Sequence, residues 1–568
     1  MSEMNAPASR VSRSGIRPRL AIASLGVEAL GAVEAWTAAA LLTAQLAVRT
    51  AYALRQGVDT DEPQHLHVAW AWTQGLVPYR DVFDNHAPLF HLTMAPLVAA
   101  LGERPDLLIA MRLAMLPLTA LLLWSTYRIG RALSGARVGV WAAVLVGTMP
   151  TFLLTSIQFR ADDLWALLWL AALATALGGP PAPGRALAAG LLIGATFATS
   201  MKTSLLFATL LGGVALILVI DPRGRLELRQ RRVWTSIVAS VAAIVVVIAM
   251  VVALFAHLGA LSQLVDLALI HNLAGRSRWD HRAPRVAMFV VTFPLIVALG
   301  AWVLRNSPSR GFARGVIVIA TLLYITTLNG FWPIVTRQDS LPFYPLLVVI
   351  VVGALLEAFP ARSATAIALL ASIAVVEGLL TFSVSPLRND GTRFYVGMVG
   401  DVLRLTSRGD PVMDLKGETL FRRRPFFYAL EDITRERIRQ GELADDIAER
   451  LVATHTYVSV VDSPRFPTGA RQFLNDNYVP IGRLRVAGQL FAADAVSGAA
   501  FIIAIPGRYA VVSPEGTMDG TLDGTPLVGS RMLEAGPHVF RPPATAEKLA
   551  VVWADAVERG FSPFRVPP

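Results

Sequence analysis

The sequence predicts an all-α membrane protein of about eleven transmembrane helices, followed by a soluble region that contains strands. Of its 568 residues, 54% are hydrophobic and 16% are charged, whereas soluble domains average roughly 45–50% and ~25%. The hydrophobic residues are gathered in long runs, many of them close to the ~20 residues that cross the hydrocarbon core of a bilayer. Cysteine is absent, which excludes disulfides, thiolate metal sites and thiol nucleophiles.

The apolar runs give the positions of the predicted spans. In chain order they lie at about 25–50, 107–127, 138–155, 163–178, 186–201, 204–220, 233–256, 286–304, 315–333, 341–358 and 364–383. The first run is the least regular, because Glu28, Glu34 and Arg49 interrupt it. A loop of helix-breaking glycines and prolines at 178–185 separates the fourth run from the fifth. We therefore expect a transmembrane domain over residues 1–384.

Basic residues are concentrated in alternate loops between these spans. The net charge of +10 comes from short arginine-rich loops, a pattern that marks cytoplasmic loops and argues against nucleic-acid binding. These loops lie near 10–19, 128–137, 185, 223–232, 305–314 and 362. With an odd number of spans, the opposite face carries the loops at 52–106, 156–163, 202, 257–285 and 329–340, and the chain beyond 385. That face is predicted to be extracytoplasmic.

The chain beyond the last span has the pattern of a soluble region. Residues 385–485 alternate strand-like runs with a charged helical stretch at 433–451, which predicts an extracytoplasmic α/β region. Residues 486–568 contain short strands separated by turn signals, which predicts a small β-sandwich-like region. In the first outer loop, Leu66–Trp72 and Pro88–Val98 are suited to lying in the membrane interface.

An acidic pair, Asp61 and Glu62, directly follows the first predicted span. Carboxylates at a membrane face lose solvation energy, so they often mark a functional site. A carboxylate placed beside a cavity can act as a general base on a hydroxyl group. The alternative is structural, because Asp-Glu-Pro ahead of a periodic run is also a good helix-capping sequence.

Several basic residues on the same face are candidates for binding an anion. Lys202 stands between two apolar runs, where its alternative role is to reach the lipid interface. Arg160 precedes Asp162 and Asp163, so a structural ion-pair cluster is equally open. Arg337 lies outside, against the usual arginine distribution. A further basic patch is more typical of lipid-headgroup contact and consists of His271, Arg276, Arg278, His281 and Arg282.

Imidazole and carboxylate side chains in the first outer loop raise the alternative of a divalent metal site. They are His65, His67, Asp84, His86 and His91. Their spacing matches no known metal motif, and His65 and His67 would point away from each other on a helix. We therefore predict neither a metal site nor a required cofactor, with a divalent cation as the open alternative.

Four segments of the chain resemble polyprenyl-phosphate-sugar-dependent glycosyltransferases of the GT-C fold. The likeness is greatest to the bacterial relatives of protein O-mannosyltransferases and of lipid A aminoarabinose transferases. Asp61–His65 matches the family's Asp-Glu pair, and Val77–Leu89 matches its Pro-Tyr-x-Asp-Phe-Phe segment. Phe159–Leu164 and Met201–Thr203 are similar to its segments near the fourth and fifth spans. The resemblance covers about residues 30–350.

The resemblance implies transfer of a sugar from a polyprenyl-phosphate donor to an extracytoplasmic hydroxyl, with inversion, in a bacterial inner membrane. It implies that Asp61 is the general base, with Glu62 beside it. Binding of the donor phosphate would fall to Lys202, Arg337, Arg160 and His86. Three more acidic residues would line the site: Asp84, Asp162 and Asp163. The chain departs from the family at His86, where many relatives have lysine, and histidine is only partly charged at neutral pH.

Two other classes of function compete with this interpretation. A transporter or flippase of lipid-linked sugars would show paired halves and ionisable residues near the bilayer midplane, whereas here they gather at one face. A non-catalytic assembly subunit would tolerate loss of the acidic pair, which this chain retains. The sequence leaves the sugar open, and the acceptor partner is a lipid, a polysaccharide or a protein.

Overall fold

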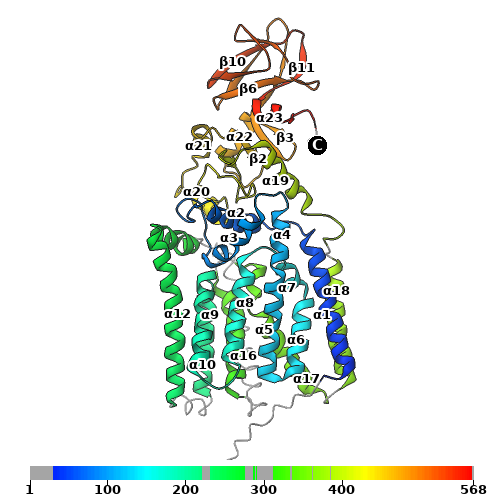
Figure 1. Ribbon diagram of the computed structural model, residues 1–568, viewed down its shortest axis with the longest axis vertical. Helices are drawn as coiled ribbons and strands as arrows, with labels where there is room; N and C mark the ends of the chain where they lie inside the picture. Colours follow the sequence, from blue (N-terminus) through cyan, green and yellow to red (C-terminus); the bar gives the residue numbers. More distant parts are fainter. Residues whose placement is uncertain are drawn as a thin grey trace, which may run out of the picture.

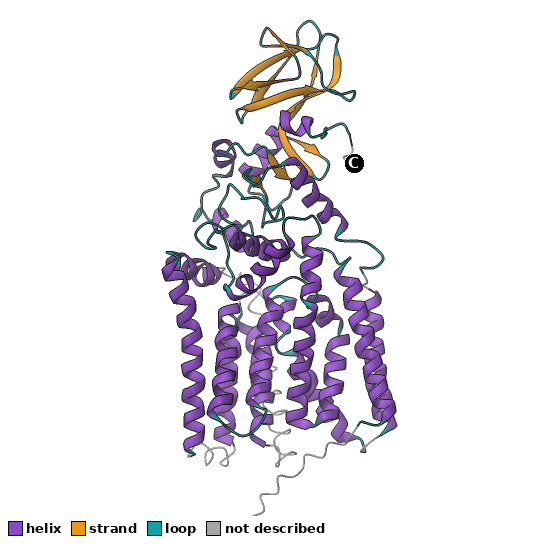
Figure 2. Cartoon of the chain, viewed as in Figure 1, coloured by secondary structure: helices purple, strands orange, loops and turns teal. Residues whose placement is uncertain are grey.

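The structure is a computed structural model that describes residues 30–220, 230–274, 286–287, 290, 294, 311–332, 335–360, 363–383 and 386–565. Long helices run side by side through one end of the molecule, and the strands lie at the other end (Figures 1 and 2). The long helices are α1 (Ala32–Ala53), α5 (Leu116–Ser134), α6 (Ala136–Thr148), α8 (Ala161–Ala176), α9 (Pro183–Thr199), α10 (Thr203–Ile220), α12 (Arg231–His257), α16 (Gly311–Phe331), α17 (Tyr344–Ala358) and α18 (Ala364–Ser383).

Glycines allow neighbouring helices in this bundle to approach closely. Gly135, whose φ of 104° favours glycine, is the single residue between the end of α5 and the start of α6. A side chain added at Gly130 would place its Cβ 2.7 Å from the Cα of Gly139, so the two backbones touch. Small residues at helix contacts are typical of membrane bundles.

The helix lengths support a membrane location without confirming the predicted number of spans. Within the described ranges, four helices are long and apolar enough to cross a membrane by length and composition: Leu107–Ser134, Arg231–His257, Phe312–Gly330 and Ala364–Ser383. The other predicted spans correspond to shorter helices, and the eighth, at 286–304, lies largely outside the described residues.

A layer of short helices covers the end of the bundle that faces the strands (Figure 1). Its members are α2 (Asp61–Thr73), α3 (Leu89–Leu101), α4 (Leu107–Ala114), α7 (Pro150–Thr155), α13 (Leu261–Val265), the π-helix η1 (Asp266–His271), α14 (Asn272–Ala274), the 3-10 helix η2 (Arg337–Ser340) and α20 (Asp432–Arg439).

Two acidic side chains stabilise the start of α2. Asp59 Oδ1 accepts a hydrogen bond from the backbone of Asp61 at 3.0 Å, and Glu62 Oε2 accepts one from the backbone of Asp59 at 3.0 Å. This reciprocal arrangement satisfies N–H groups that a helix start leaves unpaired. The negative charges also interact favourably with the helix dipole. The capping alternative is thus partly correct, with Glu62 as the residue that reaches back.

The amphipathic sequence of α2 suggested a helix in the membrane interface, but the structure buries this helix inside the protein. All residues from Glu62 to Ala71 are buried, because the helix is covered on its outer side by the soluble region. Helix α3 agrees better with the expectation, since it buries Phe90, His91, Met94 and Val98 and exposes much of its opposite face.

The soluble region contains two sheets. One has the strand order β1-β2-β4-β11-β6-β9, with β3 also paired to β4, and the other has the order β5-β10-β7-β8. Only the β1–β2 pair is parallel. The elements are α19 (Arg393–Leu405), β1 (Val412–Met413), α21 (Ile447–Ala453), β2 (Val458–Val460), α22 (Thr468–Asn477), β3 (Tyr478–Ile481), β4 (Leu484–Ala493), β5 (Ala499–Ile503), β6 (Gly507–Val512), β7 (Gly520–Leu522), β8 (Thr525–Leu527), β9 (Ser530–Leu533), β10 (Gly536–Arg541), β11 (Ala546–Trp553) and α23 (Ala554–Glu558).

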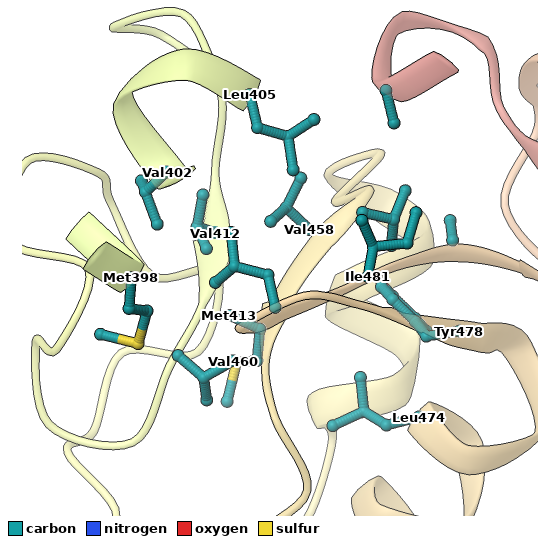
Figure 3. Close-up of a cluster of buried hydrophobic side chains, with 14 of the residues drawn as sticks. Met398, Val402, Leu405, Val412, Met413, Val458, Val460, Leu474, Tyr478 and Ile481 are labelled. Atoms are coloured by element: carbon teal, nitrogen blue, oxygen red, sulfur yellow. The ribbon is translucent and has the colours of Figure 1, made fainter. Parts of the chain in front are cut away.

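Strand β4 connects the two predicted parts of the soluble region. Its first residues pair with β2 and β3, and its later residues pair with β11. The predicted boundary between 485 and 486 therefore falls inside one strand. Below it, apolar side chains of α19, β1, β2, α22 and β3 pack together (Figure 3) and include Met398, Val402, Leu405, Val412, Met413, Val458, Val460, Leu474, Tyr478 and Ile481.

The soluble region and the layer of short helices share one apolar core. The same cluster of buried side chains contains Leu66 and Trp70 of α2, Met111 of α4, and Val412 and Val458 of the sheet. Apolar burial stabilises by roughly 25 cal/mol per Å² removed from water, so this contact fixes the soluble region firmly above α2. Side chains at this junction are therefore held by the short helices on one side and by the soluble region on the other.

Candidate functional site

A cavity of about 380 Å³ lies where the helical bundle, the short helices and the soluble region meet. Its lining comes from α2, the loop before α3, the start of α8, the α9–α10 connection, η1 and α14, the segment before η2, and the soluble region. The charged side chains in this lining are Asp61, His86, Arg160, Asp162, Lys202, Lys416, Glu431, Asp432 and Arg465.

Asp61 borders the cavity from the first turn of α2, and both oxygens of its carboxylate are engaged. Oδ2 accepts a hydrogen bond from Arg160 at 2.5 Å, and Oδ1 forms an ion pair with the ammonium of Lys416. Burial raises the pKa of Asp61, but the charges of Arg160 and Lys416 outweigh it, and the pKa lies well below its usual value. Asp61 is therefore ionised at neutral pH.

Arg160 organises the carboxylates at this end of the cavity. It precedes α8 in extended conformation and is buried, with hydrogen bonds to Asp59 at 2.6 Å and to Asp162 at 3.0 Å in addition to Asp61. Three carboxylates around one guanidinium leave it little freedom to move. The structural interpretation of Arg160 and Asp162 as an ion-pair cluster thus holds, although both also border the cavity.

Lys202 reaches the cavity from the short connection between α9 and α10. Its ammonium forms an ion pair with Asp339, a fully buried residue of η2. Asp339 also caps η2 by accepting the backbone N–H of Thr336 at 2.8 Å. Lys202 is therefore anchored between two segments and is not a free interfacial lysine.

His86 also borders the cavity and belongs to a cluster of imidazoles built on Asp84. Asp84 is fully buried and accepts hydrogen bonds from the His86 backbone and ring, each at 3.0 Å, and lies 3.1 Å from His91. His91 in turn contacts His65 at 2.8 Å. Burial raises the pKa of Asp84, but the neighbouring histidines lower it by more, so the pKa lies below its usual value. Because His86 donates through Nδ1, it offers a positive charge to a ligand only when its other nitrogen is also protonated.

This cluster has no arrangement suited to a metal ion. Within the described ranges, no group of three or more His, Asp or Glu side chains is placed to hold one. His67 lies apart from it and contacts the carbonyl of Leu420 at 2.6 Å.

Glu62 does not share the surroundings of its neighbour. It is fully buried and forms a two-point ion pair with Arg112, at 2.7 Å and 2.5 Å, and it accepts the backbone N–H of Phe159 at 2.8 Å. It is not part of the cavity lining. The expectation of a second catalytic carboxylate is corrected here, because successive residues of a helix point in different directions.

Three other predicted site residues also lie away from the cavity. Asp84 and Asp163 are fully buried and do not border it. Arg337 is exposed and is likewise outside the lining, although its neighbour Thr336 is included. The expectation that Arg337 borders the same cavity as Asp61 is therefore wrong for the described part of the chain. In the predicted patch, His271 is buried against Glu431 at 2.8 Å, and the other members lie outside the described residues.

Sequence reasoning missed two basic residues of the soluble region, Lys416 and Arg465. Both residues lie beyond residue 350, where the family resemblance ends, so the resemblance could not indicate them. One signal was present: of the 51 basic residues only three are lysines, and two of these, Lys202 and Lys416, border the cavity. The third, Lys548, is exposed on β11. Lysine offers a compact point charge, which the planar guanidinium of arginine does not.

Comparison with known proteins bears on the fold. No family model and no curated protein matches the sequence. The chain is similar to a crystal structure of ArnT from Cupriavidus metallidurans bound to undecaprenyl phosphate, with 14% identity and a TM-score of 0.52 over 80% of this chain and 98% of that one. AglB of Archaeoglobus fulgidus, an archaeal oligosaccharyltransferase in complex with an inhibitory peptide and a dolichol-phosphate, gives 11% identity and a TM-score of 0.43 over 88% and 76%. At this identity the likeness to ArnT speaks for architecture alone, and it confirms the GT-C fold expected from the sequence.

Proposed function

We propose that this chain is a membrane glycosyltransferase that moves a sugar from a polyprenyl-phosphate donor to a hydroxyl group on the outer face of the membrane. One observation carries the proposal: an ionised, hydrogen-bonded carboxylate, Asp61, borders the same cavity as Lys202, Lys416 and His86. A base for the acceptor and positive charge for a leaving phosphate are the two requirements of such a transfer. The fold shared with ArnT, which was crystallised with undecaprenyl phosphate, is consistent with it.

The reaction is a single displacement with inversion at the anomeric carbon. The acceptor oxygen forms a bond to that carbon while the bond to the phosphate oxygen breaks, and the polyprenyl phosphate leaves with the electron pair. The hydroxyl proton passes to the carboxylate of Asp61. Of the carboxylates in the described lining, Asp162 pairs with Arg160, Glu431 with His271 and Asp432 with Arg435. Asp61 pairs with two cations, Arg160 and Lys416.

Donor binding is assigned to basic residues of the cavity. Lys202 and His86 border the same cavity as Asp61 and can approach the phosphate oxygens of a donor that enters it. Arg160 completes the positive surroundings, but its hydrogen bonds to three carboxylates suit it better to holding Asp61 in place. We also propose that the protein lies in a bacterial inner membrane with its site on the extracytoplasmic face, and that the acceptor is a lipid, a polysaccharide or a protein.

A transfer assay tests the proposed function. Purified full-length protein in lipid nanodiscs is incubated with radiolabelled undecaprenyl-phosphate sugars and with lipid, polysaccharide and peptide acceptors. We expect label to leave the polyprenyl lipid with the wild-type protein and to stay there with Asp61→Asn. Movement of intact labelled lipid across a proteoliposome bilayer without loss of its sugar would instead favour a flippase.

A further inference from the structure

Lys416 brings the soluble region into direct contact with the proposed base. It lies in a tight loop after β1, where Glu418 Oε2 accepts the backbone N–H groups of Leu415 at 3.0 Å and of Lys416 at 2.7 Å. Asp414 braces the other side of the loop by accepting the backbone N–H of Gly417 at 3.0 Å. The backbone that carries Lys416 is therefore fixed, and any movement is left to its side chain.

The loop is pressed against α2. Gly417 has a φ of 97°, which favours glycine, and a Cβ at this position would lie 2.7 Å from the Cβ of His67. His67 holds the far end of the loop through the carbonyl of Leu420. Lys416 and Asp61 are thus placed by the same helix, and their ion pair is a built-in feature of the junction.

The two cations on Asp61 differ in their freedom to leave. Arg160 is held by Asp59 and Asp162 as well, so its position is determined by three carboxylates. Across the residues that the structure describes, the ammonium of Lys416 pairs with Asp61 alone. It sits at the end of a flexible four-carbon chain and binds as a point charge, whereas a guanidinium binds a carboxylate in a fixed two-point geometry. Lys416 is the partner that can be exchanged.

We propose that Lys416 is an exchangeable counter-ion: it neutralises Asp61 in the empty site and moves to the donor phosphate when the lipid enters. This inference rests on the proposed function. The exchange frees Oδ1 of Asp61 to accept the proton of the acceptor hydroxyl only after the donor is bound. The donor phosphate is a diester that carries one negative charge, as a carboxylate does, and it gains a second as its bond to the sugar breaks, so it can compete for the ammonium. The base is thus coupled to occupancy of the donor site.

Binding of undecaprenyl phosphate, without any sugar, tests the exchange. We compare the dissociation constants of full-length wild type, Asp61→Asn, Lys416→Met and the double variant in nanodiscs, with Lys548→Met as a matched control on the surface. Asp61→Asn releases the lysine, so it should bind the lipid phosphate more tightly than wild type, by roughly ten-fold. Lys416→Met should bind more weakly, and the gain from Asp61→Asn should vanish in the double variant.

Each outcome of this cycle decides between alternatives. If Asp61→Asn improves binding equally with and without Lys416, the lysine does not exchange and the inference is overturned. The same holds if Asp61→Asn leaves binding unchanged. If folded wild-type protein and all variants fail to bind undecaprenyl phosphate, the proposed function itself fails. The control Lys548→Met should match wild type.

The pH dependence of transfer gives a second readout, which tests whether Lys416 is paired with Asp61 in the free enzyme. Loss of kcat/KM at low pH reports protonation of the base in the free enzyme. Lys416 lowers the pKa of Asp61, so Lys416→Met should shift this loss to higher pH, and Lys416→Arg should keep it near the wild-type position. An unshifted profile in a folded Lys416→Met protein would overturn the inference.

Discussion

Asp61 and Glu62 are adjacent in sequence, yet one faces the cavity at the domain junction and the other is sealed in a two-point ion pair with Arg112. This contrast separates a proposed chemical role from a structural one. Asp61→Asn should reduce transfer by ~10²–10⁴-fold, because the amide cannot take a proton at neutral pH. Its melting temperature should stay close to that of wild type. Transfer at the wild-type rate would remove Asp61 as the base.

Glu62→Gln should behave in the opposite way. It leaves the guanidinium of Arg112 buried without its counter-charge, a change that typically costs about 3–5 kcal/mol of stability. Thermal unfolding of the detergent-solubilised protein should therefore show a clear decrease in melting temperature, and any loss of activity should follow the loss of folded protein. A stable Glu62→Gln protein without activity would contradict this assignment and return Glu62 to the catalytic group.

Lys202 should affect the binding of the donor more than the rate of transfer once the donor is bound. Its removal in Lys202→Ala takes one charge-assisted contact from the phosphate, which corresponds to about 1–3 kcal/mol in kcat/KM. Lys202→Arg should recover only part of the loss, because a planar fork does not replace a point charge beside Asp339. Steady-state kinetics over donor concentration measure the effect, and an unchanged KM would exclude the phosphate contact.

Arg465 is a test residue and Arg337 is its control, because only Arg465 borders the cavity. Arg465 borders the cavity, and no described residue accepts a hydrogen bond from its side chain, whereas Arg337 is exposed outside the lining. Arg465→Ala should raise the KM for the donor or an anionic acceptor by about ten-fold, the size of one charged hydrogen bond. Arg337→Ala should leave it nearly unchanged. The reverse result would mean that the bound state rearranges η2 toward the cavity.

Gly417 should tolerate no side chain. In Gly417→Ala the new Cβ meets His67 at 2.7 Å and the backbone keeps an unfavourable positive φ, so the loop must shift away from α2. We expect reduced transfer together with a lower melting temperature. Substitution of Gly524, whose φ is 78° and whose added Cβ would meet nothing within 4 Å, controls for backbone strain alone. Equal effects of both substitutions on transfer would show that the contact with α2 is unimportant.

The arrangement of the spans was easier to predict from sequence than the site. Long apolar runs are read directly from composition, so most described helices of the bundle lie close to predicted positions, for example α8 at Ala161–Ala176 against 163–178. The short outer helices were harder, because α2 looks like an interfacial helix until the soluble region that covers it is known. Residue-by-residue resemblance indicated Asp61, Arg160, Lys202 and His86 for the cavity.

What the sequence could not give is the direction of each side chain. Glu62 and Asp163 carry the same carboxylate group as their neighbours Asp61 and Asp162. The rotation of their helices alone decides that Glu62 and Asp163 are buried while Asp61 and Asp162 border the cavity. Lys416 could be found only by noticing how rarely the chain uses lysine. Its partner is 355 residues earlier, and no local pattern encodes a contact over that separation.

The single apolar core that runs from α2 into the sheet has a consequence for how this protein can be altered. Its outer part cannot serve as an interchangeable module, because a foreign replacement would have to reproduce the underside of the sheet and the lysine loop at once. A protease nick between α18 and α19 should leave the fragments associated and functional, held by that buried surface.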